Sequence, residues 1–410
     1  MNKDRKIELL APAGDMEKLK TAIIYGADAV YFGGEMFSLR AGAGNLTVDE
    51  IAEAMDFIHE HGARGYMTIN IYPHNADIPL LRDYLRKIRD LPIDAFLVSD
   101  PGAMMLIRES IPDAEIHLST QANTTNYLTA AYWASQGVRR IVAAREMSLE
   151  ELSEMRKQLP EDIEIEAFVH GAMCISYSGR CLLSNFMAGR DANRGACTHP
   201  CRWKYALVEQ QRPGEYYPIE EDGRGSYILN SRDLCMIDRI QDIVAAGVYS
   251  FKIEGRMKSM YYVATVVSAY RAAIDDYLAD PENYRFNEKH FAELCKASHR
   301  EFTHGFYYNK PTDKDQNYLT SDYVRDYSFV GLVGKHDSET GLTTVEQRNK
   351  FSVGDTVEIF GPQTPFYEET IEEMYNEEGE PVQSAPHPQQ ILRIRFKRVP
   401  GENFIIRKKK

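Results

Sequence analysis

The stretch Ala95-Phe96-Leu97-Val98-Ser99-Asp100 holds four apolar residues followed by two polar ones, and this short pattern recurs along the chain. Between most of the apolar runs lies a stretch with helical periodicity that ends at a Gly or Pro. Strands that alternate with helices predict a parallel sheet with right-handed crossovers. Eight apolar runs fit the pattern, at residues 7–11, 29–32, 65–70, 95–99, 115–119, 140–143, 163–169 and 250–253.

Eight such units match the size of a closed (β/α)₈ barrel, which takes about 250 residues. We therefore predict an α/β fold built on a TIM-like barrel. An open, doubly wound sheet is the alternative, although no G-x-G-x-x-G motif follows the first run. In a barrel, the chemistry lies at the C-terminal ends of the strands. Polar side chains follow the apolar runs at those ends, namely Arg40, Asn70, Ser99, Gln121, Arg145, His170, Glu254 and Arg256.

Composition and charge exclude several classes of protein. The chain has 410 residues, of which 43% are hydrophobic and 27% charged, as in an ordinary globular protein. No apolar run reaches the roughly 18 residues of a membrane span, and no secretory segment follows Met1, so we expect a cytoplasmic protein with no membrane partner. The net charge of −13 argues against a basic coat protein but leaves room for a local basic site.

Four of the six cysteines gather in one insertion, residues 171–230, which interrupts the seventh unit. Four thiolates can hold a [4Fe–4S] cluster or a structural zinc ion, and unligated or catalytic thiols are a third interpretation. The first gap of six residues is longer than zinc ribbons normally use. Cys235, expected early in a helix, is an alternative fourth ligand, whereas Cys295 is expected to pack in an amphipathic stretch. The clustered cysteines are Cys174, Cys181, Cys197 and Cys201.

The same insertion is locally basic. Asp191 is the only acidic residue among residues 171–205, which also carry five cationic side chains and several aromatic ones. Cations beside thiolates lower the thiol pKa, and they offset the charge of a thiolate-bound cluster. We expect an anionic substrate to bind here, with ordinary ion pairs as the alternative. The cationic residues are Arg180, Arg190, Arg194, Arg202 and Lys204.

The chain divides into three segments by pattern. Residues 1–280 are expected to form the barrel with its insertion, and residues 281–326 a helical and irregular connector. Residues 327–410 show short alternating runs, which predict a small β-barrel domain. The chain ends in Arg407-Lys408-Lys409-Lys410, a basic tail that we interpret as a solvated end, with nucleic-acid contact as the alternative.

Around the first two clustered cysteines the sequence resembles peptidase family U-32. The resemblance extends to the segments at residues 10–14, 27–31 and 252–256, and it covers roughly residues 5–400. The motif that carries it is Glu166-x-Phe168-x₂-Gly171-Ala172-Met173-Cys174-x₄-Gly179-x-Cys181-x-Leu183-Ser184.

This resemblance implies a function other than ordinary proteolysis. Related branches of the family resemble oxygen-independent hydroxylation proteins that carry a [4Fe–4S] cluster. The branch most similar to this chain acts on tRNA, where it helps to form 5-hydroxyuridine at the wobble position with prephenate as the implicated donor. Sister branches act on ribosomal RNA and in ubiquinone biosynthesis.

The resemblance also suggests roles for individual residues. The four clustered cysteines would hold the cluster, and Arg40 and Arg256 would bind the carboxylates of a small dicarboxylate co-substrate. Asn70, Gln121, His170 and Glu254 would orient the substrate or move protons. The cationic residues of the insertion would bind tRNA, with Arg190, Arg194, Arg202 and Lys204 on the phosphates and Arg180 beside them.

Two other functions are left open. The family name suggests a peptidase of the collagenase kind, although the sequence has neither a G-x-S-x-G nor an H-E-x-x-H motif. A zinc-stabilised RNA-binding protein is the non-enzymatic alternative. The sequence also leaves open whether the chain works as a homo-oligomer or a hetero-oligomer.

Overall fold

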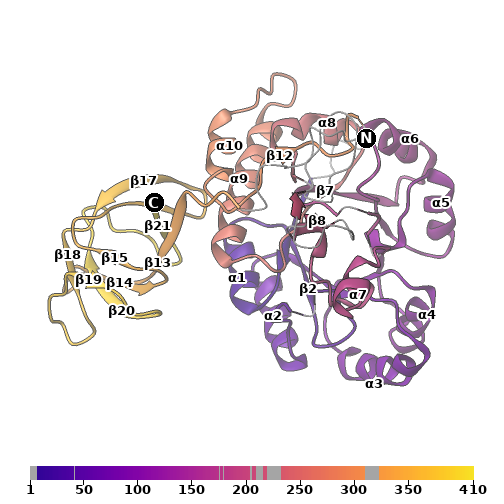
Figure 1. Ribbon diagram of the computed structural model, residues 1–410, viewed down its shortest axis with the longest axis horizontal. Coiled ribbons are helices and arrows are strands. Elements are labelled where there is room, and N and C mark those ends of the chain that lie inside the picture. Colours follow the sequence, from indigo (N-terminus) through magenta and orange to yellow (C-terminus); the bar gives the residue numbers. More distant parts are fainter. Residues whose placement is uncertain are drawn as a thin grey trace.

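The computed structural model has two parts, a large α/β barrel and a smaller all-β module that contains the C-terminus (Figure 1). The structure describes residues 7–40, 42–174, 176–178, 180–203, 206–208, 216–218, 232–309 and 323–410. Of the predicted substrate-binding residues, Lys204 lies outside this description, and so does the side chain of Arg202.

Eight parallel strands close the barrel and confirm the TIM-like fold predicted from the repeated apolar runs. Each strand pairs with the next one along the chain, and the last strand pairs with both the first and the seventh, so the sheet closes on itself. The strands are β1 (Glu8–Ala13), β2 (Ala29–Gly33), β3 (Arg64–Ile69), β4 (Ala95–Val98), β5 (Ile116–Leu118), β6 (Arg140–Val142), β7 (Glu164–Ala172) and β11 (Ser250–Ile253).

Helices surround the barrel on its outside (Figure 1). Some begin at strong local signals: Thr47 and Ser148 each form a capping box with the glutamate three residues on. Of the helices in the described ranges, none is both long and apolar enough to cross a membrane. The helices are α1 (Met16–Ile24), α2 (Val48–Glu60), α3 (Ile78–Ile88), α4 (Pro101–Ser110), α5 (Tyr127–Ser135), α6 (Leu149–Gln158), α8 (Ile240–Ala245) and α9 (Met260–Ala279).

The connection after β7 departs from the regular pattern. β10 (Asp233–Cys235) runs antiparallel to β7, and β12 (Phe302–Thr303) pairs with β10. Cys235 therefore lies in a strand where the sequence predicted a helix, because these residues form a ladder with β7. The described elements between β7 and β10 are short: α7 (Leu183–Ala188), η3 (Ala192–Arg194), η4 (Pro200–Arg202), β8 (Ala206–Val208) and β9 (Tyr216–Pro218).

The C-terminal module is antiparallel, and its all-β character confirms the prediction from the alternating runs. Its main sheet has the strand order β17-β16-β21-β13-β14-β20-β18, and β15 pairs with β19. The basic tail was expected as a solvated end, but most of it forms β21 (Ile405–Lys409), between β16 and β13. The other strands are β13 (Tyr327–Asp337), β14 (Leu342–Gln347), β15 (Phe351–Ser352), β16 (Thr356–Gly361), β17 (Thr364–Thr370), β18 (Glu373–Tyr375), β19 (Ser384–Ala385) and β20 (Ile391–Arg395).

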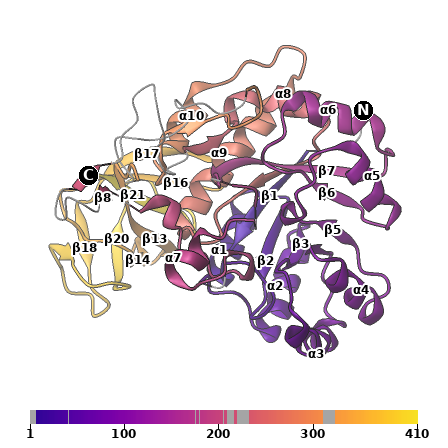
Figure 2. The ribbon, with the colours of Figure 1, turned by 45° about the vertical axis from the view of Figure 1, so that its right-hand side comes forward.

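Arg407 of β21 joins the module to the barrel. Its side chain is fully buried and donates to Glu358 in β16 at 2.7 Å and to Glu293 in α10 (Glu288–Leu294) at 2.6 Å. Nearby, the rings of Tyr261 and Phe329 stack with their centroids 5.8 Å apart. A buried guanidinium needs such partners to offset its loss of hydration, so the contact fixes the module against α9 and α10 (Figure 2).

The interior of the barrel holds a buried network of ion pairs. Arg140 in β6 is fully buried, and its Nη1 donates to Glu8 Oε1 at 2.6 Å and to Glu166 Oε2 at 3.2 Å. A third carboxylate, that of Glu164, lies 2.7 Å from Arg140 Nη2. Lys252 Nζ in β11 pairs with Glu166 Oε1 at 2.7 Å. Each buried charge in this network is therefore compensated by an opposite charge on another strand.

Replacing Arg140 by methionine should destabilise the fold strongly, because it leaves Glu8 and Glu166 in the interior without their shared cation. Removing one partner of a buried ion pair typically costs about 3–5 kcal/mol. Urea denaturation of Arg140→Met would measure this loss. Arg139→Met is the matched control, since Arg139 forms an exposed pair with Asp162, and such pairs contribute less than about 1 kcal/mol. Equal losses of unfolding free energy in the two variants would contradict a stabilising role for the buried network around Arg140.

Candidate functional site at the mouth of the barrel

A cavity of about 120 Å³ opens at the C-terminal ends of the barrel strands and is walled on one side by the insertion. It lies where a TIM barrel carries its chemistry. Nine of the residues predicted for the site line this cavity together. They are Arg40, Asn70, Gln121, Glu254 and Arg256 from the barrel and Cys174, Cys181, Cys197 and Cys201 from the insertion.

Glu254 is held between two arginines in this cavity. Arg40 Nη2 donates to Glu254 Oε1 at 3.3 Å, and Arg145 Nη2 donates to Oε2 at 3.5 Å. Burial opposes ionisation of the carboxyl group, but the two guanidinium groups outweigh burial and hold its pKa below the ordinary value. Glu254 is therefore an ionised carboxylate at neutral pH. Both distances are longer than the roughly 2.8 Å of a tight charge-assisted bond, which leaves both arginines able to bind another carboxylate.

Arg256 holds the β2–α2 loop in place. Its Nη1 donates to Ser38 Oγ at 2.8 Å and to the Leu39 carbonyl at 2.9 Å, and its Nη2 donates to Asn45. The partners are neutral, so burial lowers the Arg256 pKa to about 10. These contacts position the backbone next to Arg40, which adopts a left-handed conformation with φ of 66°. The geometry thus gives Arg256 a positioning role, in addition to its place on the cavity wall.

Amide side chains complete the polar wall. The Oδ1 atom of Asn70, directly after β3, accepts a hydrogen bond from the backbone N–H of Leu39 at 3.0 Å. Gln121 lies in the short helix η2 (Thr120–Ala122) that follows β5, and its buried Oε1 has no hydrogen-bond partner among the described residues. A buried acceptor of this kind favours a ligand that carries a hydrogen-bond donor.

The four clustered cysteines face one cavity, and two of their sulfur atoms already accept hydrogen bonds. Arg145 Nη1 donates to Cys174 Sγ at 3.6 Å, and the His199 backbone N–H donates to Cys197 Sγ at 3.4 Å. Such donors stabilise thiolates that ligate a metal centre. Across the described ranges, however, no group of three or more His, Cys, Asp or Glu side chains is arranged to hold a metal ion.

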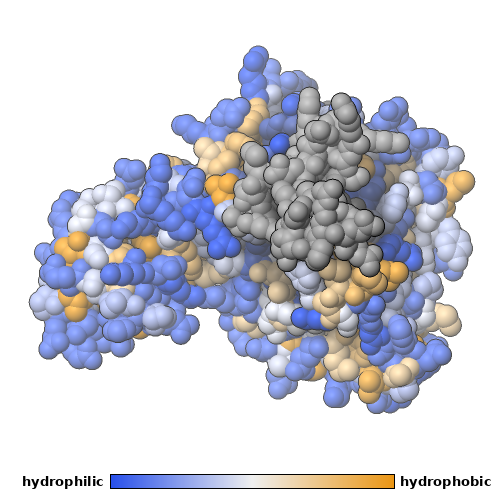
Figure 3. Space-filling view, in the orientation of Figure 1, coloured by the Kyte–Doolittle hydropathy of each residue, from blue (hydrophilic) through white to orange (hydrophobic). Residues whose placement is uncertain are grey.

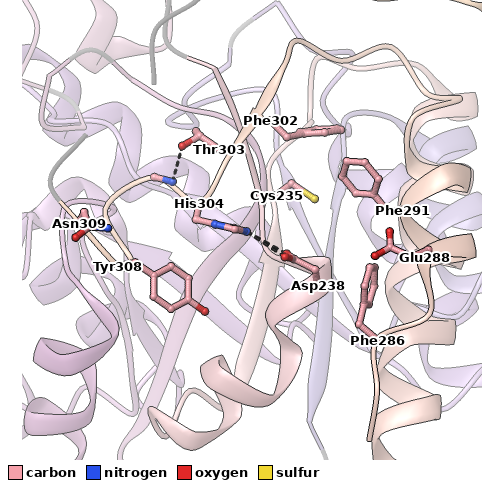
Figure 4. Close-up of a pocket in the computed structure, with 11 residues that line it drawn as sticks. Cys235, Asp238, Phe286, Glu288, Phe291, Phe302, Thr303, His304, Tyr308 and Asn309 are labelled. Carbon is pink, nitrogen blue, oxygen red and sulfur yellow. Dashed lines mark hydrogen bonds and ion pairs between the residues drawn. The ribbon is translucent and has the colours of Figure 1, made fainter. Parts of the chain in front are cut away.

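Cys235 lies away from this cluster and lines a second cavity of about 490 Å³ (Figure 4). In that cavity it faces the aromatic rings of Phe291 and Phe302, and Asp238 forms an ion pair with His304 at 3.1 Å. Burial raises the pKa of the Cys235 thiol to about 12, so it is protonated at neutral pH. Its place in a separate cavity gives no support to its use as a fourth ligand.

His170 points away from the mouth cavity. The pairing of β7 with β11 shifts by one residue after Phe168, so Lys252 lies opposite Phe168 and Ile253 lies opposite His170. This bulge turns His170 to the outer face of the barrel, where it packs between Tyr262 and Tyr270 of α9. Burial lowers its pKa to about 3 and keeps it neutral. The structure therefore does not bring His170 to the candidate site, although strict alternation along β7 would have placed it there.

The cationic residues of the insertion have different surroundings. Arg194 is bound to Asp77 by two hydrogen bonds of 2.6 and 3.1 Å, so it forms the ion pair that was the alternative to substrate binding. Arg180 and Arg190 are exposed, and Arg180 lies over the ring of Tyr72 at 5.6 Å. Near them, α7 and the residue before it present exposed apolar side chains (Figure 3), which are Leu182, Phe186 and Met187.

Two cationic residues of the cavity, Arg145 and Lys252, had no role assigned from the sequence. Arg145 stood out only as one of the polar residues after a strand, and its contacts with Glu254 and Cys174 depend on folding. Lys252 lies inside a strand, where the apolar run around it gave no sign of a functional side chain. The signal that would have identified Lys252 is its charge, since an isolated lysine in an inward-facing strand position needs a buried partner.

Two family models match the chain. That of peptidase family U32 matches residues 14–317, and that of the peptidase family U32 C-terminal domain matches residues 325–407. The chain is 43% identical over 392 residues to tRNA hydroxylation protein P1 of Bacillus subtilis (strain 168), covering 96% of this chain and 92% of that one. It is 39% identical over 422 residues to tRNA hydroxylation protein P of Escherichia coli (strain K12), with 93% and 92% covered. A more distant relative in Porphyromonas gingivalis, 31% identical with 90% and 89% covered, is named collagenase.

The ion pair between Arg194 and Asp77 predicts a lowered pKa for the Asp77 carboxyl group, which can be measured. Hydrogen bonds from Arg194 lower the Asp77 pKa from 3.8 to about 2. Because the folded pKa is below the unfolded one, the pair stabilises the protein above pH 3.8, and this stabilisation is lost as the pH falls through about 2. In Arg194→Gln the Asp77 pKa should return toward 3.8, as measured by ¹³C NMR of labelled aspartate. Arg190→Gln should leave it near 2, and a pKa near 2 in Arg194→Gln would refute the pairing.

Proposed function

The chain belongs to peptidase family U32, and from this membership and the site at the barrel mouth we propose that it catalyses oxygen-independent hydroxylation of tRNA. The observation that carries the proposal is its similarity, over more than nine tenths of both chains, to two relatives named as tRNA hydroxylation proteins. The product we propose is 5-hydroxyuridine at the wobble position.

The charge of the cavity supports an anionic co-substrate. Arg40, Arg145 and Arg256 line it, and Glu254 is the carboxylate between the first two. This excess of cations favours a ligand with one or two carboxylates, and the forked guanidinium groups can bind each carboxylate by two hydrogen bonds. We propose a small dicarboxylate with prephenate as the candidate.

The insertion supports a [4Fe–4S] cluster as the redox centre. Its four cysteines line the same cavity as the proposed co-substrate site, and two sulfur atoms have N–H donors directed at them. The donor set fits the cluster by ligand type and number. Because the four sulfur atoms are not gathered around one point, binding would have to draw the segments of the insertion together. When bound, the cluster would supply one-electron redox chemistry beside the co-substrate.

The surface next to the cavity supports RNA as the second substrate. Arg180 and Arg190 are exposed cations, and Phe186 in α7 is 84% exposed. Phosphates bind exposed cations, while an unstacked base gains about 1–3 kcal/mol from packing on an aromatic ring. This combination suits a single-stranded loop whose target base enters the cavity.

Nucleoside analysis tests the proposed reaction. A strain that lacks this gene should lose 5-hydroxyuridine derivatives from its tRNA, and the intact protein should restore them. With Arg145→Gln the restored amount should be at least tenfold lower, since the variant removes the charged hydrogen bond to Glu254, and a tenfold loss corresponds to about 1.4 kcal/mol. Arg139→Gln, on the opposite end of the barrel strands, should restore the intact level. An unchanged tRNA profile in the deletion strain, with cleavage of denatured collagen by the pure protein, would favour the peptidase instead.

Metal analysis tests the proposed cluster. Anaerobically purified protein should be brown and contain about four iron atoms per chain. Cys174→Ser should lose the iron, whereas Cys235→Ser should keep it because that thiol lies in the second cavity. Colourless protein with one zinc ion per chain would overturn the cluster and favour the zinc-stabilised RNA-binding protein.

A further inference from the structure

Lys252 places a primary amine at the floor of the mouth cavity. Its side chain is 5% exposed, yet the residue lines the cavity together with Glu254, two positions further along the chain. The aromatic rings of Tyr31 and Phe168 flank the amine, with their centroids 4.3 and 5.5 Å from Nζ. Lys252 is therefore held between two aromatic rings and the Glu166 carboxylate, and it lines the cavity that would hold the ligand.

The surroundings of Lys252 favour release of its proton. Nζ lies 2.7 Å from Glu166 Oε1, but the other oxygen of Glu166 accepts from Arg140 at 3.2 Å, so two cations share one carboxylate. Burial lowers the pKa of Lys252, and the attraction of Glu166 only partly offsets this effect. A desolvated lysine with a lowered pKa is the usual form of an amine nucleophile toward carbonyl compounds.

The protein groups that could bind a carboxylate and a neighbouring carbonyl group line the same cavity. Arg40 and Arg145 provide guanidinium groups for a carboxylate, and Lys252 provides an amine for a carbonyl carbon next to it. We propose that Lys252 forms an imine with the carbonyl group of a 2-oxo carboxylate bound in the cavity. This inference rests on the proposed function only in taking the cavity as the co-substrate site.

The step balances without an oxidant or a reductant. Lys252 passes one ammonium proton to Glu166, and the free amine attacks the carbonyl carbon, so that a C–N bond forms and the C=O π bond breaks. The carbinolamine oxygen receives the proton held by Glu166 and a second proton from the nitrogen, and it leaves as water. The product is a protonated imine, whose positive charge replaces that of the ammonium opposite Glu166.

Reduction with borohydride tests the inference on the native protein. The full chain is incubated separately with pyruvate, 2-oxoglutarate and prephenate, treated with sodium borohydride, and mapped by mass spectrometry of its peptides. At least one 2-oxo acid should give a reduced adduct on Lys252 in the majority of molecules. Succinate, a dicarboxylate without a carbonyl group, should give none.

Lysine variants define the outcome. Lys258→Met, six residues on, should keep the adduct, and Lys252→Met should lose it at least tenfold. If Lys252→Met fails to fold because Glu166 loses a partner, Lys252→Met with Glu166→Gln removes both charges and serves in its place. No adduct on native Lys252 with all three acids, or equal labelling of surface lysines, would overturn the inference. An adduct without tRNA hydroxylation would refute the proposed function alone, and hydroxylation without an adduct would refute the imine alone.

Discussion

Charges inside the barrel have to be neutralised in place, because an isolated buried charge costs several kcal/mol. In the lower part of the barrel this condition is met by pairing. Arg140 and Lys252 are cations, Glu8 and Glu166 are anions, and all four are held by contacts of 2.6 to 3.2 Å. The network connects β1, β6, β7 and β11, so it also ties together the strands on both sides of the point where the barrel closes.

At the mouth of the barrel, positive and negative side chains are not balanced in this way. Arg40, Arg145 and Arg256 face the cavity with Glu254 as their one carboxylate there, and Arg256 has only neutral partners among the residues described. A cavity with this excess of positive charge is completed by an anion. The carboxylates of the proposed co-substrate and the thiolates of the insertion would both supply negative charge to this cavity, which is consistent with the proposal that the two ligands share one site.

The sequence was sufficient for the barrel and for much of the site, since both depend on a local pattern. Apolar runs and their polar ends located Arg40 and Glu254, because the ends of parallel strands meet on one side of a barrel. The predictions from sequence were wrong where the pairing of strands or of distant charges overrides the local sequence pattern. A bulge turned His170 outward, and the ladder with β7 made a strand of the segment around Cys235. Arg407 looked like part of a solvated tail because its carboxylate partners lie far away in the sequence.

Several hydrogen bonds anchor the insertion to the loops at the mouth of the barrel, among them those of Arg145 and Arg194. Arg145 binds Cys174 close to the end of β7, while Arg194 binds Asp77 in the connection after β3. Of the described residues between these two contacts, Ser176, Tyr177, Cys181 and Ala192 line the cavity. Arg145 also binds Glu254. Because Arg145 donates to Cys174 through Nη1 and to Glu254 through Nη2, it links the carboxylate of the cavity to the first of the four sulfur atoms.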